Sequence, residues 1–282
     1  MKYICTRLKK ESAGFRLLLR SIPSVTVSVF ILSVVCANLM ANKELVSFRF
    51  LALDCGFVFS WIMFLCMDVI CKRWGAKASI QISALALVIN LCVCGIFALL
   101  ALAPGKWGQS YVYAEPSAAY EVNKSLNATF AGTWYVVLGS ALAFMVSSCV
   151  NAVLNAGAGK FLAARGKHDG FAAFAFRSYI STAVAQLADN LIFAVTVSKI
   201  FFGWTWTQVV ACSCAGVVAE LLAEVIFSGL GYRVLCIWEK DSVGKDYLDY
   251  MNIKRSENES SYNRNRRRNR QGMRAAFLTE RA

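Results

Sequence analysis

The sequence predicts an all-α, polytopic membrane protein with six transmembrane helices. Hydrophobic residues make up 57% of the 282 positions, the mean hydropathy is +0.51, and only 17% of the residues are charged. Soluble domains of this length are less apolar. A spanning helix needs roughly 20 mostly apolar residues. Six windows meet this requirement, at about residues 22–40, 50–71, 79–103, 130–157, 171–201 and 207–236.

The distribution of basic residues predicts the topology of these spans. The segments 1–21, 72–78, 158–170 and 237–282 together hold 23 of the 30 Lys and Arg residues. The alternate segments 41–49, 104–129 and 202–206 hold four. Because basic residues concentrate on the cytoplasmic side of membrane proteins, we expect both termini to be cytoplasmic in a multi-pass protein of the cytoplasmic (inner) membrane.

Three regions follow from this pattern. Residues 1–21 are a basic cytoplasmic N-terminus, 22–238 a six-helix transmembrane domain, and 239–282 a basic cytoplasmic tail that is expected to be disordered. The tail could bind RNA or anionic lipid, or serve only to fix the topology, and we favour the second interpretation. Apart from this tail, no nucleic-acid partner is expected.

The first three spans are mainly apolar, and their ends carry the polar residues. The first is too long for a cleavable signal peptide and ends near Asn38. The second places Asp68 and Lys72 one turn apart at its cytoplasmic end, where they could form an internal salt bridge or contact a ligand. After the third, residues 104–129 carry Pro and Tyr residues and predict an extracytoplasmic loop with a short helix near 117–127.

The last three spans contain polar residues at helical spacing. Asn151 and Asn155 lie one turn apart in the fourth span, and Glu220 and Glu224 do so in the sixth. The fifth carries one polar stripe, made of Thr182, Gln186, Asp189 and Asn190, and also contains Arg177. An ionised residue at a membrane helix centre is unfavourable by roughly 2.5–3.5 kcal/mol, so such residues usually face a protein interior or a substrate path. For Asp189 and the glutamate pair, we expect function rather than helix–helix contacts alone.

Other classes of site find little support. The eleven cysteines form no Cys-x-x-Cys pair, and we interpret them as small buried hydrophobic residues. His168 is the only histidine, so neither a metal site nor a cofactor is expected. No nucleotide-binding, metalloprotease or serine-nucleophile motif is present.

Four motifs in order give the chain a resemblance to a known family. They are Ala37–Lys43 closing the first span, Gly56 followed by Asp68-Val-Ile-Cys-Lys-Arg-Trp-Gly75, Arg177-x-x-x-Ser181-Thr182-x-x-x-Gln186-x-x-Asp189, and a segment ending near Gly231-Tyr232. With these motifs the chain resembles the vitamin-uptake-transporter (VUT) family, also called queuosine precursor transporters. It departs from the family pattern at Lys72, Asn151 and Glu220.

The resemblance implies a transporter, not an enzyme, that imports a purine-like or vitamin-like small molecule such as a 7-deazaguanine base. The residues expected to bind the substrate are Asn38, Asp68, Lys72, Asn151, Arg177, Gln186, Asp189, Glu220 and Glu224. The family's build resembles the substrate-binding subunits of energy-coupling-factor transporters, which leaves room for an energising partner subunit. Proton coupling through Glu220 and Glu224 is the alternative that the residues themselves suggest.

Two interpretations from other classes remain open at this point. Asp68 and Asp189 could form the catalytic dyad of an intramembrane aspartyl hydrolase. The chain could also be a membrane scaffold whose basic tail recruits RNA or lipid.

Overall fold

The structure is a computed structural model, and it describes residues 2–40, 44–48, 51–105, 107, 116–131, 134–166, 170–200 and 203–256. The chain divides into two compact units. The larger one spans Pro23–Asp241. The smaller one combines Met1–Ile22 with Ser242–Ala282, so the two predicted cytoplasmic ends belong to a single unit.

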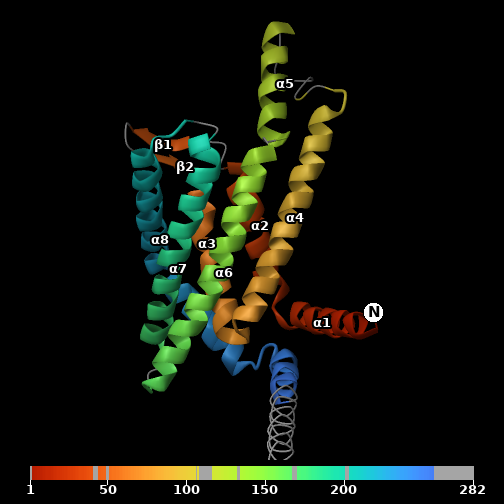
Figure 1. The fold of residues 1–282 in the computed structure, drawn as a ribbon, viewed down its shortest axis with the longest axis vertical. Helices are drawn as coiled ribbons and strands as arrows, with labels where there is room; N and C mark the ends of the chain where they lie inside the picture. The colour runs from red at the N-terminus through yellow and green to blue at the C-terminus, as the bar shows by residue number, and fades with distance from the viewer. Residues whose placement is uncertain are drawn as a thin grey trace, which may run out of the picture. The chain divides into compact units, whose positions relative to one another are not determined.

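The larger unit is a bundle of long helices with one short β-hairpin (Figure 1). The elements are α2 (Ser24–Met40), β1 (Glu44–Phe48), β2 (Leu51–Asp54), α3 (Phe57–Trp74), α4 (Ala76–Leu102), α5 (Pro116–Ala131), α6 (Trp134–Ala164), α7 (Phe171–Phe193), the π-helical turn η1 (Ala194–Lys199) and α8 (Trp206–Lys240). The helix α7 packs against α6, α8 and α3, which places it at the centre of the polar contacts described below.

Local sequence explains where several helices begin and end. Gly75 separates α3 from α4 with a positive φ of 89°, a conformation that glycine adopts without strain. α8 begins with a capping box, in which the amide of Gln208 donates to Thr205 Oγ1 and the Gln208 side chain accepts from the amide of Thr205. The expected loop helix near 117–127 is confirmed as α5.

One predicted window starts in a different structure. The second window was expected to be helical from about residue 50, but residues 51–54 form strand β2 and the helix begins at Phe57. The strand pairs antiparallel with β1, so backbone N–H and C=O groups of residues 51–54 find hydrogen-bond partners outside a helix.

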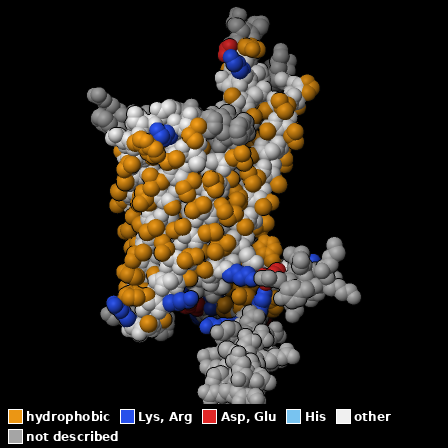
Figure 2. Space-filling model, in the orientation of Figure 1, with side chains coloured by type: hydrophobic (Ala, Val, Ile, Leu, Met, Phe, Trp, Pro, Cys, Tyr) orange, Lys and Arg blue, Asp and Glu red, His pale blue; other side chains and the backbone are white. Residues whose placement is uncertain are grey.

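The bundle exposes large apolar side chains and buries polar side chains among apolar ones. Large hydrophobic side chains on the outer faces are exposed, for example Leu99 at 70% and Ile226 at 72% of their surface. Figure 2 shows hydrophobic side chains over the middle of one face, with the described Lys and Arg side chains nearer its ends. In contrast, 21 polar or charged residues of the described chain are buried. Extended exposed apolar surface of this kind belongs to a membrane protein.

Not every helix satisfies the criteria for a membrane span alone. Among the described residues, four helices are long and apolar enough, at Ala76–Leu102, Leu138–Ala164, Phe171–Lys199 and Trp206–Lys240. The number rises to five if Glu11–Ser21 and Ser24–Met40 count together. α2 has only 17 residues, and α3 carries Asp68, Lys72 and Arg73 within its 18. The all-α membrane fold is therefore confirmed, whereas six spans stay a prediction.

The smaller unit changes the picture of the tail. Disorder was expected from residue 239, but α8 continues to Lys240 and residues 245–256 form a further helix. This helix contacts α1 (Lys2–Ser21) through an ion pair of 2.6 Å between Lys254 Nζ and Glu11 Oε1. The tail therefore begins as ordered structure because the N-terminal helix supplies a partner. Residues 257–282, with the Arg-rich run, lie outside the described residues.

Close contact between α3 and α8 depends on a glycine. A Cβ atom on Gly231 would lie 2.7 Å from Leu65 Cδ1 and 3.3 Å from Val69 Cγ2, whereas a Cβ on Gly229 would meet nothing within 4 Å. Small residues at such positions let membrane helices approach closely.

We expect Gly231→Ala to lower the thermal unfolding temperature of the purified protein in detergent, because the added methyl group overpacks the α3–α8 contact at a cost of about 1–3 kcal/mol. Gly229→Ala is the matched control on the same helix, and alanine's better helix propensity should leave its unfolding temperature equal or higher. Equal destabilisation by both variants would contradict this account of the packing.

Candidate functional site

Asp68 of α3 is surrounded by hydrogen-bond donors from two neighbouring helices. Its side chain is completely buried. Oδ1 accepts from Asn151 Nδ2 at 2.8 Å, Asn155 Nδ2 at 2.9 Å and Ser181 Oγ at 3.4 Å. Oδ2 accepts from Ser178 and from Thr182 Oγ1 at 3.5 Å. A carboxylate that is shielded from solvent needs several hydrogen-bond donors from the protein, because bulk water cannot supply them.

Arg177 reaches the same carboxylate through an amide. Its Nη2 donates to Asn155 Oδ1 at 2.6 Å, and its Nε donates to the Asn155 carbonyl at 3.1 Å. Asn155 in turn donates to Asp68, so it connects the buried cation of α7 with the buried anion of α3. A Cβ on Gly159 would lie 2.8 Å from Arg177 Cζ, which shows how closely the guanidinium group lies against α6.

Glu224 of α8 joins this network through a serine. Ser178 Oγ contacts Glu224 Oε1 as well as Asp68 Oδ2. Glu224 is completely buried. The polar cluster of Asp68, Asn151, Asn155, Arg177, Ser178, Ser181, Thr182 and Glu224 thus connects four helices, and we call it the polar core.

Three buried polar atoms at or beside the polar core have no hydrogen-bond partner. They are Asn151 Oδ1 on α6, Gln186 Nε2 on α7 and Glu224 Oε2 on α8. Gln186 lies one turn beyond Thr182 on the same face of α7. Buried polar atoms without partners are rare in native proteins, so these two acceptors and one donor are candidate contacts for a ligand.

Glu220 and Glu224 each contact a serine of a different neighbouring helix. Ser60 Oγ of α3 donates to Glu220 Oε1 at 2.5 Å, whereas Glu224 contacts Ser178 of α7. One turn of helix therefore directs the two carboxyl groups to different neighbouring helices. The pairing expected from the sequence, Glu220 with Glu224, is replaced in the hydrogen bonds by a pairing of Glu224 with Asp68 through Ser178.

Two other predicted site residues make hydrogen bonds to serines of α6. Asn38 donates to the Val34 carbonyl of its own helix at 3.1 Å and accepts from Ser140. Asp189 accepts from Ser147 Oγ at 2.7 Å. Lys72 is half-buried, one turn after Asp68 on α3.

The two aspartates of the hydrolase alternative lie at different levels along α7. Asp68 contacts α7 at Ser178, Ser181 and Thr182. Asp189 lies seven residues beyond Thr182, which is about 10 Å along a helix. A catalytic dyad needs two carboxyl groups close enough to share one proton. The geometry therefore gives no support to that alternative.

Sequence reasoning missed the residue that joins the two carboxyl groups. Ser178 lies one turn before Thr182, on the same stripe as Gln186, and this spacing could have identified it. Ser60, the partner of Glu220, lies two turns before Asp68 on α3 and could have been found in the same way. Serines are common in membrane helices, so neither stands out by residue type alone.

Metal binding has no geometric support in the part of the chain that the structure describes, where no group of three or more His, Cys, Asp or Glu side chains could hold an ion.

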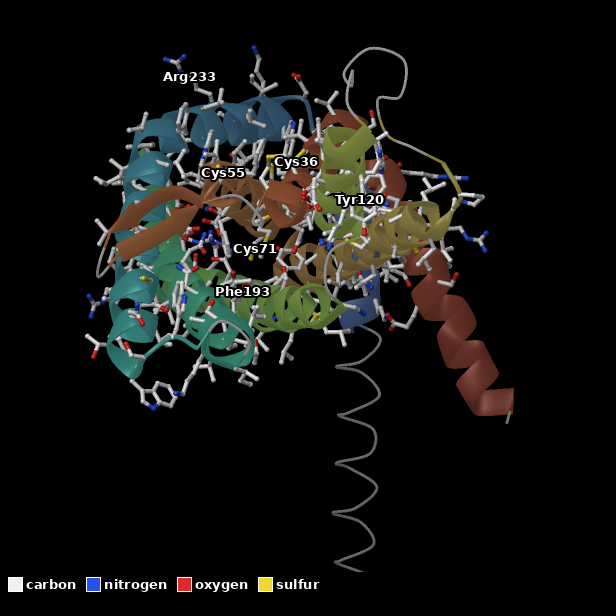
Figure 3. All side chains as sticks on the ribbon, turned by 90° about the horizontal axis from the view of Figure 1, so that it is seen from above. Cys36, Cys55, Cys71, Tyr120, Phe193 and Arg233 are labelled. Atoms are coloured by element: carbon white, nitrogen blue, oxygen red, sulfur yellow. The ribbon has the colours of Figure 1, made fainter. Side chains whose placement is uncertain are left out.

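Cys71, one turn after Asp68, lies inside the ring of helices, whereas Arg233 points away from it (Figure 3). The Cys71 thiol donates to the Ala152 carbonyl at 3.5 Å, so this residue joins α3 to α6.

A family model agrees with this architecture. The model described as "Putative vitamin uptake transporter" matches residues 54–234, which include every residue of the polar core. The chain belongs to this family. This vitamin-uptake-transporter family member is accordingly a multi-pass membrane protein of a transporter family. No curated protein and no solved structure matches the chain.

We expect Asp68→Ala to destabilise the protein strongly, because it leaves the donors of Asn151, Asn155 and Ser178 without an acceptor, at about 1–3 kcal/mol for each buried group. Asp68→Asn keeps one acceptor oxygen and should lower the unfolding temperature less. Thermal unfolding in detergent measures both. A drop for Asp68→Asn as large as that for Asp68→Ala would contradict the assignment of Asp68 as the common acceptor.

Proposed function

We propose that the protein imports a small polar heterocycle, a queuosine precursor with a 7-deazaguanine base, across the cytoplasmic membrane. The family match supports transport of a vitamin-like small molecule. The observation that supports this particular substrate is the set of buried atoms without partners, Asn151 Oδ1, Gln186 Nε2 and Glu224 Oε2.

The chemistry of the base suits these atoms. A 7-deazaguanine base offers a ring N–H beside an exocyclic amine, which together can donate to a carboxyl group or an amide oxygen. Its carbonyl oxygen accepts, and the amide nitrogen of Gln186 is a donor without a partner. Two acceptors and one donor in the protein therefore complement the two donors and one acceptor of the base.

The flat face of the base would suit an aromatic neighbour. Trp61 of α3 stacks on Phe227 with ring centroids 4.1 Å apart. This contact occupies one face of the indole ring. Recognition by the hydrogen-bonding atoms of α6, α7 and α8 is accordingly the main argument for the substrate class.

We propose that both termini lie in the cytoplasm, with six spans between them. The ion pair between Glu11 and Lys254 supports this topology, because two helices in contact, the N-terminal one and the one over 245–256, lie on the same side of the membrane. Two ends on one side require an even number of crossings. With α2 and α3 added to the four longest helices, that number is six.

We expect Gln186→Leu to reduce uptake of a 7-deazaguanine base without lowering the unfolding temperature, because the substituted amide nitrogen has no partner within the protein. Loss of one neutral hydrogen bond, about 0.5–1.5 kcal/mol, corresponds to a KM raised roughly 2- to 10-fold. Uptake is measured in cells that cannot make queuosine precursors, with queuosine in tRNA as the readout.

Ser83→Ala is the matched control, since Ser83 Oγ on α4 is also buried without a partner but lies outside the polar core. It should leave uptake unchanged. Failure of the unsubstituted protein to restore queuosine would refute the substrate assignment. Normal uptake by Gln186→Leu would remove Gln186 from the site.

The topology makes a separate prediction. The double variant Glu11→Cys and Lys254→Cys should be joined by a bifunctional thiol crosslinker that is about as long as the two replaced side chains, because the wild-type side chains meet at 2.6 Å. Each single variant is the control, and each introduced thiol should react with a membrane-impermeant reagent only in inside-out vesicles. Labelling of the two positions from opposite sides would overturn the even number of spans.

A further inference from the structure

One serine hydroxyl contacts two buried carboxyl groups. Ser178 Oγ lies within hydrogen-bonding distance of Asp68 Oδ2 and Glu224 Oε1. A hydroxyl group carries one hydrogen, and an ionised carboxylate can only accept. Ser178 can therefore donate to one of the two carboxyl groups, and the hydrogen of the other contact has to come from a protonated carboxyl group.

The surroundings of the two carboxyl groups decide which one holds that hydrogen. Asp68 accepts from Asn151, Asn155, Ser181 and Thr182 in addition to Ser178, so both of its oxygens are stabilised as a carboxylate. Glu224 has one oxygen on Ser178, lies within reach of Thr182 and Asp68, and has a second, buried oxygen with no partner. A carboxyl group with fewer donors than its neighbour is neutral more readily.

The charges around the site lead to the same assignment. Arg177 of α7 lies on the Asp68 side, connected through Asn155, and the two charges balance each other. On α8, Glu220 is bound by Ser60, and Ser228 contacts the hydroxyl of Tyr179 of α7 at 2.8 Å. On η1, Lys199 lies over the Trp206 ring, 4.5 Å from its centroid. Ionisation of Glu224 would thus place a second negative charge across Ser178 from Asp68.

We infer that Asp68, Ser178 and Glu224 form a proton-binding site, in which Glu224 donates its proton to Ser178 and Ser178 donates to Asp68. The ligand of this site is a single proton, exchanged with water when the helices separate. Release of the proton leaves two carboxylates on one hydroxyl, which favours separation of α3 and α7 from α8. Proton binding therefore controls whether these three helices stay joined at the polar core.

The occupancy of the site can be measured without any substrate. Infrared spectra of the purified protein at pH 7 should contain a C=O stretching band of a protonated carboxyl group that shifts in D₂O. This band should be missing in Glu224→Gln and present in Glu220→Gln, the matched control one turn away on α8. Absence of the band in the unsubstituted protein, its persistence in Glu224→Gln or its loss in Glu220→Gln would each overturn the inference.

A transport measurement extends the test and rests on the proposed function. In liposomes, an inward proton gradient should drive accumulation of a 7-deazaguanine base by the unsubstituted protein, and a protonophore should abolish it. Glu224→Gln, which resembles the protonated side chain, should keep exchange of internal for external base but lose gradient-driven accumulation. Accumulation by this variant equal to that of the unsubstituted protein would contradict proton coupling.

The two measurements separate the two proposals. If no base is transported but the carboxyl band behaves as described, the substrate assignment fails and the proton site stands. If transport is driven by a sodium gradient and the band is absent, the proton site is wrong and the transporter assignment stands.

Discussion

A carboxylate inside an apolar bundle requires hydrogen-bond donors, and the arrangement of this protein's helices depends on that requirement. Asp68 accepts from Asn151 and Asn155 of α6 and from Ser178, Ser181 and Thr182 of α7. In water these contacts would contribute little, but away from water each unmade bond leaves a costly buried group. The hydrogen bonds to the Asp68 carboxyl group therefore fix α3, α6 and α7 relative to one another.

The fourth helix of the polar core is attached differently. α8 reaches α7 through Glu224 and Ser178, and it reaches α3 through Glu220 and Ser60 and through the close contact at Gly231. The Gly231 contact is apolar and insensitive to charge. The two carboxyl contacts depend on protonation and on small neighbouring hydroxyl groups. A change of charge at the polar core would thus act on α8 more than on the α3–α6–α7 set.

This division suits a protein that has to open and close around a small molecule. The atoms without partners belong to α6, α7 and α8, which includes both the fixed set and the helix attached to it by Glu224. A ligand that bound all three helices would make hydrogen bonds only when α8 is in place. Substrate binding and the position of α8 are then parts of one equilibrium, since a ligand shifts a conformational equilibrium by its difference in affinity for the two states.

The amino-acid sequence determined the membrane class, most helix positions and many of the polar residues inside the helices, because hydrophobic length and helical spacing are local properties. Asp68, Asn151, Arg177, Gln186 and Glu224 were identified from spacing and from the cost of burying polar groups, and the structure places them in or beside the polar core. The same reasoning grouped Asn38 and Asp189 with them, although their hydrogen bonds go to Ser140 and Ser147.

Only the tertiary structure decided which carboxyl groups act together. The sequence places Glu220 and Glu224 one turn apart on a helix, but their directions are resolved by the neighbours that pack on α8, Ser60 from α3 and Ser178 from α7. It also gives no reason to connect Asp68 with Glu224, which are separated by 156 positions (224 minus 68). Periodicity reports which face of a helix a residue occupies, whereas its partner across the interface depends on the rotation and depth of every helix in the bundle.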